Sequence, residues 1–480
     1  MTITVALYSH DSVGLGHARR NRAVAHTLAA GLPRITGHRV RGLLIAGHPG
    51  AAADSLPPGW DWMVLPGFSP AAEGYTARHL EMSSAQLSRL RRSAVAAAVE
   101  SLEPDLFIVD RHPFGIDGEL TPALDQLRRR GTRCVLGLRE VLDSPEAASR
   151  EWAAVGAGAV ADSYDAVWVY GDPSVHDPIA AGEVPPALAD RAEFTGYLSR
   201  DRPSDDAPAP VPSRSAEQSA GPVRADGSSV GAVDGAVDPA DVIVGSPVPY
   251  VLTTVGGGSD GGRLAAAAAA ADVPAGHRHV IITGPQMPDQ DHDAVVRAAA
   301  ANRQQIPGPT DRIRVERRSA HMLQLIREAK AVVSMCGYNS AAEILDTTTP
   351  ALFVPRSARR AEQPRRAASL AAAGAAEMLD AAEADGEAIG DWFAGSVSRR
   401  VSRERIDRDG LSRLPEIAAA QLRLVPPTSS FPDPHDPGAP SATGLGHGVD
   451  RAAGRSSDHA AEHTTEHDHP TIERILHHVR

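Results

Sequence analysis

Residues 330–379 contain two consecutive strand–turn–helix patterns, and this stretch constrains the fold more than any other. The first pattern runs from the apolar residues 331–335 through a turn at Gly337 into a helix. The second runs from the apolar residues 351–355 through a polar loop into a helix that begins near Glu362. Continuous apolar runs that alternate with helices predict a parallel sheet buried on both faces. Ligands of such sheets bind beyond the carboxyl ends of the strands.

The residues after the first turn indicate a nucleotide site. Gly337, Asn339 and Ser340 open a helix, and a helix N-terminus offers free N–H groups and partial positive charge to phosphate. Glu343 follows one turn later, where a carboxylate can accept two hydrogen bonds from a ribose diol. The alternative for Glu343 is a solvated helical carboxylate, which is the commoner situation for an isolated glutamate.

This stretch resembles the donor-binding half of GT-B glycosyltransferases, in the family that includes the bacterial enzyme adding N-acetylglucosamine to lipid I. The resemblance is carried by Ser334, Gly337, Glu343, Pro355, Gln363 and the sequence Gly374-Ala375-Ala376. It implies an α/β fold of two Rossmann-like domains facing across a cleft. It also implies that Glu362 and Gln363 contact donor hydroxyls, although polar loop residues often only face water.

The implied activity is the transfer of a sugar from a nucleotide diphosphate donor to an acceptor hydroxyl, with inversion. This would be a hexosyltransferase-type glycosyltransferase. UDP is favoured as the nucleotide over GDP or TDP. The family resemblance further implies that no essential metal is required, and that no cofactor is needed beyond the nucleotide sugar.

Composition divides the chain into four segments. Residues 1–200 form the predicted acceptor domain and residues 249–424 the predicted donor domain. Residues 201–248 are rich in Pro, Gly and Ser, and residues 425–480 are rich in His; both segments are predicted to be disordered. The tail histidines have no fixed geometry, so adventitious metal binding is the better interpretation of them.

The first domain alternates apolar runs with helical patterns. The strands are expected at 40–46, 61–65, 105–110, 133–138 and 166–170 after a first strand at 2–8, and the helices at 76–102, 120–130 and 145–163. A last helix is expected within 402–424, and the resemblance implies that it can return to the first domain.

A glycine turn after the first strand carries the favoured catalytic residue. Gly14 and Gly16 precede His17, but the turn lacks the full dinucleotide fingerprint and is weak by itself. The resemblance implies that this loop faces the acceptor, with His17 as general base. The alternatives are a histidine that caps the helix, or a histidine that polarises or positions while Asp11 or another carboxylate is the base. The catalytic candidates are therefore His17, Asp11 and His10.

Two further groups of candidates follow from the architecture. Residues at the carboxyl ends of the strands that end near 110 and 138 are candidates for acceptor recognition. With the glycine turn, the acceptor-side set is Gly14, Gly16, Asp110, His112 and Arg139.

The donor-side set comes from a second glycine cluster, a loop after residue 316 and the stretch 330–379. The cluster lets backbone N–H groups approach a diphosphate, and the family holds the nucleotide base with the matching loop. The set is Gly256, Gly257, Gly258, Ser259, Arg318, Ser319, Met322, Gly337, Asn339, Ser340, Glu343, Glu362 and Gln363.

Charge and composition limit the partners. A net charge of −12 and a pI near 5.9 argue against a nucleic-acid partner. Cys134 and Cys336 are predicted to be buried thiols, and the sequence shows neither a secretory signal nor a membrane-spanning run, so a cytoplasmic location is expected. The acceptor is left open between a small molecule, a glycan and a lipid-linked molecule. A basic cluster, Arg89, Arg91 and Arg92, suggests peripheral contact with anionic lipid, although a solvated helix face is favoured.

Two alternatives to a transferase share the predicted fold. One is a nucleotide-sugar 2-epimerase, which needs several carboxylates and a histidine around C2 of the sugar. The other is a non-catalytic protein that binds a nucleotide sugar.

Overall fold

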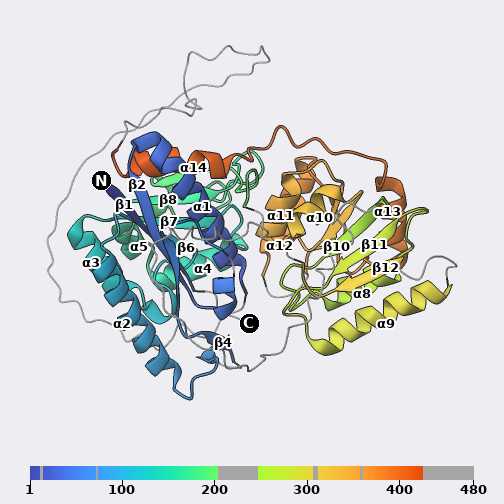
Figure 1. The fold of residues 1–480 in the computed structure, drawn as a ribbon, viewed down its shortest axis with the longest axis horizontal. Helices are drawn as coiled ribbons and strands as arrows, with labels where there is room; N and C mark the ends of the chain where they lie inside the picture. The colour runs from blue at the N-terminus through green and yellow to red at the C-terminus, as the bar shows by residue number, and fades with distance from the viewer. Residues whose placement is uncertain are drawn as a thin grey trace, which may run out of the picture.

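The protein consists of two α/β domains that lie side by side (Figure 1). In the computed structural model, the described residues are 1–10, 14–53, 55–71, 74–203, 247–305, 312–319, 321–356 and 360–424. The predictions of disorder for the linker and the tail fall almost wholly on residues 204–246 and 425–480, which lie outside the described residues.

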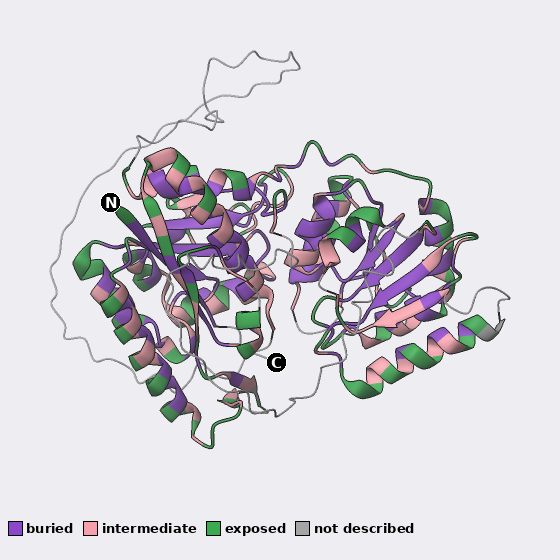
Figure 2. Cartoon of the chain, viewed as in Figure 1, coloured by how far each residue is buried: buried purple, intermediate pink, exposed green. Residues whose placement is uncertain are grey.

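The first domain is built on a seven-stranded sheet whose ladders are all parallel, in the order β3-β2-β1-β6-β7-β8-β9. Every residue of β6 and β8 is buried, as the continuous apolar runs predict (Figure 2). The strands are β1 (Thr2–Ser9), β2 (Arg39–Ala46), β3 (Trp60–Val64), β6 (Leu106–Asp110), β7 (Arg133–Arg139), β8 (Ala166–Tyr170) and β9 (Ala192–Phe194).

Helices cover both faces of this sheet. On one face α2 packs against α3, and on the other α1 packs against the last helix of the chain (Figure 1). The helices are α1 (Gly16–Thr36), α2 (Ser84–Leu102), α3 (Thr121–Arg130), α4 (Pro145–Val155), α5 (Ala157–Ser163) and α6 (Pro186–Ala189), with 3-10 turns η1 (Pro49–Ala53) and η2 (Ile116–Gly118).

Two predicted helices differ from the structure. The helix expected from residue 76 begins at Ser84, because Ser83 and Gln86 form a reciprocal capping box there. Residues 75–77 instead form β5 (Tyr75–Ala77), which pairs with β4 (Phe68–Pro70) in an antiparallel hairpin. The helix expected over 145–163 is interrupted at Gly156, whose φ of 78° lies outside the helical region.

The second domain repeats the design on a six-stranded parallel sheet, in the order β12-β11-β10-β13-β14-β15. Its strands are β10 (Tyr250–Thr254), β11 (Arg278–Ile282), β12 (Ile313–Glu316), β13 (Val332–Ser334), β14 (Ala351–Phe353) and β15 (Glu377–Met378). Its helices are α8 (Gly262–Ala270), α9 (Asp289–Gln305), α10 (Met322–Glu328), α11 (Tyr338–Leu345), α12 (Glu362–Ala372) and α13 (Gly386–Ser396). Helices α11 and α12 lie on the side toward the first domain (Figure 1).

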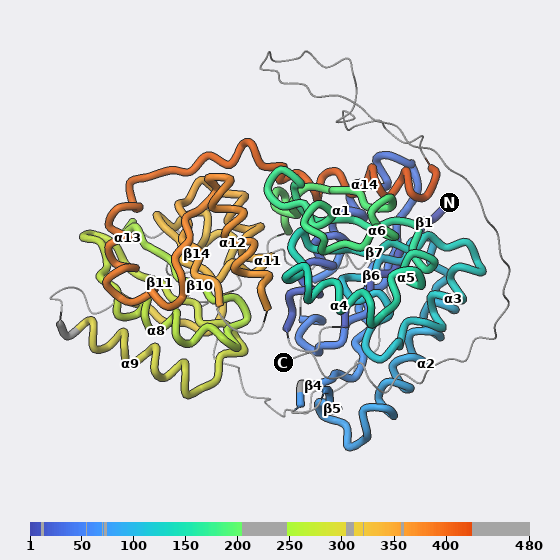
Figure 3. Tube along the Cα trace, turned by 180° about the vertical axis from the view of Figure 1, so that it is seen from behind, coloured from blue at the N-terminus to red at the C-terminus, as the bar shows by residue number. Residues whose placement is uncertain are grey.

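The chain crosses between the domains a second time near its C-terminal end. After α13 it returns to the first domain, where α14 (Gly410–Gln421) lies along α1 (Figures 1 and 3). Leu198 and Asp409 form an antiparallel bridge where the two crossings meet. The described end of the first domain therefore lies beside the residue that precedes α14.

The strand order changes direction beside the first strand of each sheet. In the first sheet β1 lies between β2 and β6, and in the second β10 lies between β11 and β13. At both points a residue other than glycine takes a left-handed conformation just after the strand: Arg111 with φ 70° and Cys336 with φ 61°. Such conformations are costly and concentrate at functional sites, and the crevice at a switch point is where ligands of these sheets bind.

Candidate active site

The glycine loops of the two domains face each other. Gln286 lies between them: a Cβ added to Gly14 would lie 3.5 Å from its Oε1, and one added to Gly257 would lie 2.8 Å away. Nearby, Asn339 Nδ2 in α11 donates to the backbone oxygen of Gly16 at 2.9 Å. The structure therefore places the start of α1 against the start of α11.

His17 forms a dyad with a buried carboxylate. Its Nδ1 lies 3.1 Å from Oδ2 of Asp110, which is fully buried at the end of β6. Arg20 Nη2 holds the same carboxylate from both oxygens, at 2.8 and 2.6 Å. An ionised carboxylate can only accept, so the Asp110 contact makes Nδ1 the donor. Arg20, which can only donate, lies 3.2 Å from Nδ1 and in this tautomer donates to Asp110 instead. In that tautomer Nε2 is free to accept a proton.

The electrostatics of this group favour an ionised Asp110. Burial raises the pKa of Asp110, but the charges of Arg20 and His17 outweigh it and hold the pKa well below its usual range. Two other imidazoles crowd the same place: the His10 ring lies 4.9 Å from that of His17 and 4.1 Å from that of His112. Burial lowers the pKa of both His10 and His112, so both are neutral near pH 7. Asp11, the remaining catalytic candidate, lies outside the described residues.

Arg139, predicted on the acceptor side, reaches across to the second domain. Its Nη2 lies 2.6 Å from Oε2 of Glu362. The other carboxylate oxygen, Oε1, lies 3.2 Å from Arg356 Nη2. Burial lowers the pKa of Arg139 to about 10, with Glu362 opposing it. Burial also opposes ionisation of Glu362, but Arg139 and Arg366 lower its pKa to about 2. Glu362 is therefore a charged residue of the interface, next to Gln363, whose Oε1 accepts from the backbone N–H of Arg356.

Helix α11 begins at the boundary of the two domains, where Asn339 contacts Gly16. Gly337 precedes it with φ −63°, and no side chain caps its first N–H groups. The side chain of Tyr338 lies between guanidinium groups from both domains: Arg20 is 5.2 Å from the ring centroid and Arg366 is 5.6 Å from it. The uncapped end has the geometry that binds phosphate.

Glu343, the predicted ribose ligand, is buried in α11 and already has partners. Arg19 of α1 and Arg202 each lie 3.1 Å from its Oε1. The sequence pattern predicts neither arginine as a donor-site residue. Arg19 follows directly on the glycine turn, but Arg202 stands in the segment that composition assigns to the linker.

The remaining donor candidates lie on loops beside this helix. Gly258 has φ 91°, and a Cβ there would lie 2.1 Å from the backbone oxygen of Thr283, so only glycine fits. Ser259 and Arg318 are exposed, whereas Ser319 Oγ accepts from the backbone N–H of His321 just before α10 begins at Met322. These loops lie at the carboxyl ends of β10 and β12.

Two ion pairs of α12 and a hydrogen bond from the residue before it connect this helix to the first domain. Arg366 lies 2.8 Å from buried Glu140, Arg365 lies 2.8 Å from Glu183, and the backbone N–H of Ala361 donates to Asp143. The sequence did not predict these pairs, because their partners are more than 180 positions apart. They hold the helix that carries Glu362 and Gln363 against the ends of the first sheet.

The basic cluster, for which a solvated helix face was favoured over a lipid contact, includes one arginine that does not lie at the surface. Arg91 is fully buried and lies 2.6 Å from Glu119, which also accepts from Tyr8. Arg92 donates to the backbone oxygen of Asp117. Among these three arginines, at least Arg91 therefore stabilises the core of the first domain rather than facing a membrane.

Residues 253–393 match the family model described as glycosyltransferase family 28 C-terminal domain. The second domain is therefore similar to the C-terminal domain of family 28 glycosyltransferases. The match covers less than half of the chain and includes the glycine cluster, α11 and α12. A comparison with curated proteins found no match.

Solved structures similar to this chain include both transferases and epimerases. A putative UDP-N-acetylglucosamine 2-epimerase from Listeria monocytogenes is 10% identical and has a TM-score of 0.54, covering 90% of this chain and 100% of its own. MurG from Acinetobacter baumannii is 13% identical with a TM-score of 0.44, covering 87% and 95%. The calicheamicin glycosyltransferase is 14% identical with a TM-score of 0.44, covering 88% and 94%. At 10% identity, the likeness with a TM-score of 0.54 shows the fold alone. The two Rossmann-like domains have the GT-B fold.

Among the described residues, no group of three or more His, Cys, Asp or Glu side chains is placed to hold a metal ion. Within the same ranges, no helix is long and apolar enough to cross a membrane.

Proposed function

We propose that the protein is an inverting glycosyltransferase that moves a hexose-type sugar from a nucleoside diphosphate, with UDP favoured, to an acceptor hydroxyl. The observation that carries the proposal is the His17–Asp110 dyad beside the uncapped start of α11. The family 28 match of the second domain supports it. A general base thus lies next to a phosphate-binding helix end, across the boundary of the domains.

In the proposed reaction, the acceptor oxygen attacks the anomeric carbon of the sugar. The bond from that carbon to the diphosphate oxygen breaks as the new glycosidic bond forms, and the diphosphate leaves with the electron pair. His17 Nε2 takes the acceptor proton, and Asp110 stabilises the resulting imidazolium. The N-termini of α8 and α11 stabilise the charge on the leaving diphosphate, which is consistent with a reaction that needs no metal.

The carboxylates at the boundary of the domains favour sugar transfer over 2-epimerisation, because arginines already bind them. Asp110, Glu140 and Glu362 are each held by an arginine, through Arg20, Arg366 and Arg139 respectively. An epimerase needs carboxylates that approach C2 of the sugar. Epimerases nevertheless share the fold, so the test includes their reaction.

The first test is calorimetric titration with UDP, GDP and TDP and their sugars, on the wild type and on Glu343→Ala and Glu343→Gln. Saturable binding of one nucleotide series is expected, with a loss of affinity in both variants. Exposed Glu328→Ala is the matched control and should bind as the wild type does. Absence of binding to every nucleotide would overturn the proposal.

A second test separates the reaction classes. Transfer to a panel of small-molecule, glycan and lipid-linked acceptors is expected for a transferase. Deuterium incorporation at C2 of UDP-N-acetylglucosamine without acceptor would identify an epimerase instead. Tight nucleotide-sugar binding with neither reaction would identify a binding protein.

We also propose that the protein works in a reducing compartment such as the cytoplasm. Cys134 and Cys336 are both free and buried, which supports this location.

A further inference from the structure

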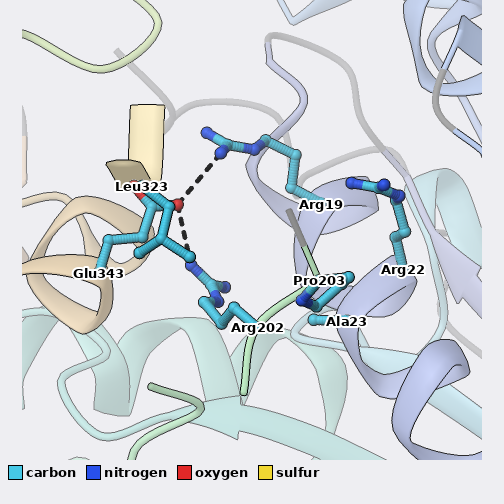
Figure 4. A pocket seen from close by; sticks show the side chains of 7 residues that line it. All are labelled: Arg19, Arg22, Ala23, Arg202, Pro203, Leu323 and Glu343. Carbon is cyan, nitrogen blue, oxygen red and sulfur yellow. Dashed lines mark hydrogen bonds and ion pairs between the residues drawn. The ribbon is translucent and has the colours of Figure 1, made fainter. Parts of the chain in front are cut away.

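The carboxylate predicted to bind the donor ribose is held by two arginines that reach it from outside its own domain. Arg19 Nη2 and Arg202 Nη1 both donate to Oε1 of Glu343. Figure 4 shows the two guanidinium groups approaching this oxygen from different directions. Arg202 also donates to Asn339, from Nη2 to the side-chain oxygen at 2.8 Å and from Nη1 to the backbone oxygen at 3.3 Å.

The space around these groups is too small for a ribose. The cavity bounded by α1, residues 202–203, α10 and α11 has a volume of about 20 Å³. A cavity of this size holds about one water molecule. A ribose can therefore reach Glu343 only if the arginine side chains move, either by themselves or with their domain.

The charge of the cavity suits an anion. Three arginines line it, Arg19, Arg22 and Arg202, against the single carboxylate of Glu343. Burial lowers the pKa of Arg202, Glu343 raises it, and Arg19 lowers it further. An additional anion nearby would therefore stabilise the charge of Arg202. Guanidinium groups bind phosphate in a bidentate fork.

Arg202 also occupies the path that a diphosphate would take. One end of its guanidinium contacts Glu343, the proposed ribose ligand, and the other contacts Asn339. Asn339 in turn contacts Gly16, the neighbour of His17. In a nucleotide sugar, the diphosphate connects the ribose to the reacting sugar carbon, which is the same span.

We propose that Arg202, assisted by Arg19, exchanges partners when the donor binds. The ribose diol takes the place of the guanidinium groups on Glu343, and the guanidinium groups bind the diphosphate. The inference rests on the proposed function and extends it, because it assigns two arginines outside the second domain to donor recognition. It also makes donor affinity depend on how the first domain is placed.

The test compares a nucleotide that has the diphosphate with one that lacks it. UDP and uridine are titrated into the full chain by calorimetry, for the wild type and for Arg202→Ala, Arg202→Gln and Arg202→Lys. We expect Arg202→Ala and Arg202→Gln to bind UDP about 10-fold to 100-fold more weakly, the effect of losing a charged hydrogen bond. Uridine affinity should be unchanged or higher, and Arg202→Lys should be intermediate.

The matched control is Arg200→Ala, two positions earlier. The Arg200 side chain is 45% exposed and pairs with Asp409, outside the proposed site, so UDP affinity should not change. Thermal unfolding of each variant shows whether the fold is retained.

Two results would decide against the inference. UDP binding to Arg202→Ala as tight as or tighter than in the wild type would mean that Arg202 only occupies the ribose site. An equal loss of UDP and uridine would mean a general disturbance of the pocket. If the wild type binds no UDP, the comparison is made with GDP and guanosine or TDP and thymidine; no binding of any of these overturns the proposed function itself.

Discussion

The first strand–loop–helix unit of each domain has the same architecture and a different chemistry. In the first domain, β1 and a glycine turn lead into α1, which carries His17, Arg19 and Arg20 near the boundary with the second domain. In the second, β10 and a glycine cluster lead into α8, whose buried residues are one leucine and three alanines. The first unit therefore brings charged side chains to the boundary of the domains, whereas the helix of the second is mostly alanine, which favours contacts through backbone N–H groups.

This difference fits the two halves of the proposed reaction. A diphosphate is bound well by N–H groups and a helix dipole, which need glycine for close approach. A proton transfer needs a side chain whose tautomer is fixed by a partner, and Asp110 supplies that for His17. The division of labour can be tested on each side separately.

The largest expected effect is on catalysis by the first domain, where His17 is the proposed general base. His17→Ala should lower kcat by about 10²-fold to 10⁴-fold, the usual contribution of a general base. UDP affinity should stay within twofold, because the diphosphate contacts are elsewhere. Steady-state kinetics and calorimetry measure the two quantities.

The control for His17 is the exposed His79, whose replacement by alanine should leave kcat unchanged. An unchanged kcat in His17→Ala would show that the dyad is structural, and the contrast between the two units would be lost.

The next effect concerns the second domain's own charged residues, which we expect to hold the domains together. Arg366→Ala leaves Glu140 buried without its ion pair, and should lower the free energy of unfolding by about 3–5 kcal/mol. Chemical denaturation of the variant and the wild type measures the difference.

The double variant Arg366→Met with Glu140→Gln removes both charges and should recover most of this loss. A single variant as stable as the wild type would mean that this pair contributes nothing net to the interface.

The smallest expected effect is on UDP affinity in the second domain, where backbone N–H groups are proposed to bind the diphosphate. A Cβ added to Gly337 meets no atom within 4 Å, and φ there is −63°, so Gly337→Ala should unfold at the temperature of the wild type. The added methyl group lies where phosphate would approach the start of α11, and UDP affinity should fall about 10-fold, the equivalent of about one hydrogen bond.

Gly258→Ala is the contrasting variant. Its Cβ would lie 2.1 Å from a backbone oxygen, so it should destabilise the fold itself. Unchanged UDP binding in Gly337→Ala would show that the diphosphate does not reach α11.

Local patterns were sufficient to predict most of the sheet strands. Apolar runs of four to eight residues between glycine turns identify β1, β6, β7 and β10 because a strand buried on both faces needs no polar residue. The helix predicted over 76–102 was too long at its start, since the capping box at Ser83 competes with an apolar period that extends beyond it. The short pairs β4–β5 and the strand β15 have no such period.

The sequence predicted which residues lie in the candidate site better than it predicted which residues they contact. A strand end located Asp110 and the turn before a helix located Glu343, because the carboxyl ends of parallel strands meet at one edge of a sheet. The family resemblance selected His17 and Glu362. Their partners depend on the relative placement of elements that the sequence pattern does not fix. Arg202 is the clearest example, since its surroundings in the sequence resemble a linker.

The sequence by itself determined two strand–turn–helix domains, with glycine turns before helices in the second and a histidine at the glycine turn of the first. Periodicity and turn chemistry act over a few residues, so they can be read without the fold. Only the tertiary structure decided that Asp110 orients His17, 93 positions away, and that Arg19 holds Glu343, 324 positions away. Burial makes these pairings strong, because a charge removed from water is stable only beside a partner, and which partner is near depends on how the two domains meet.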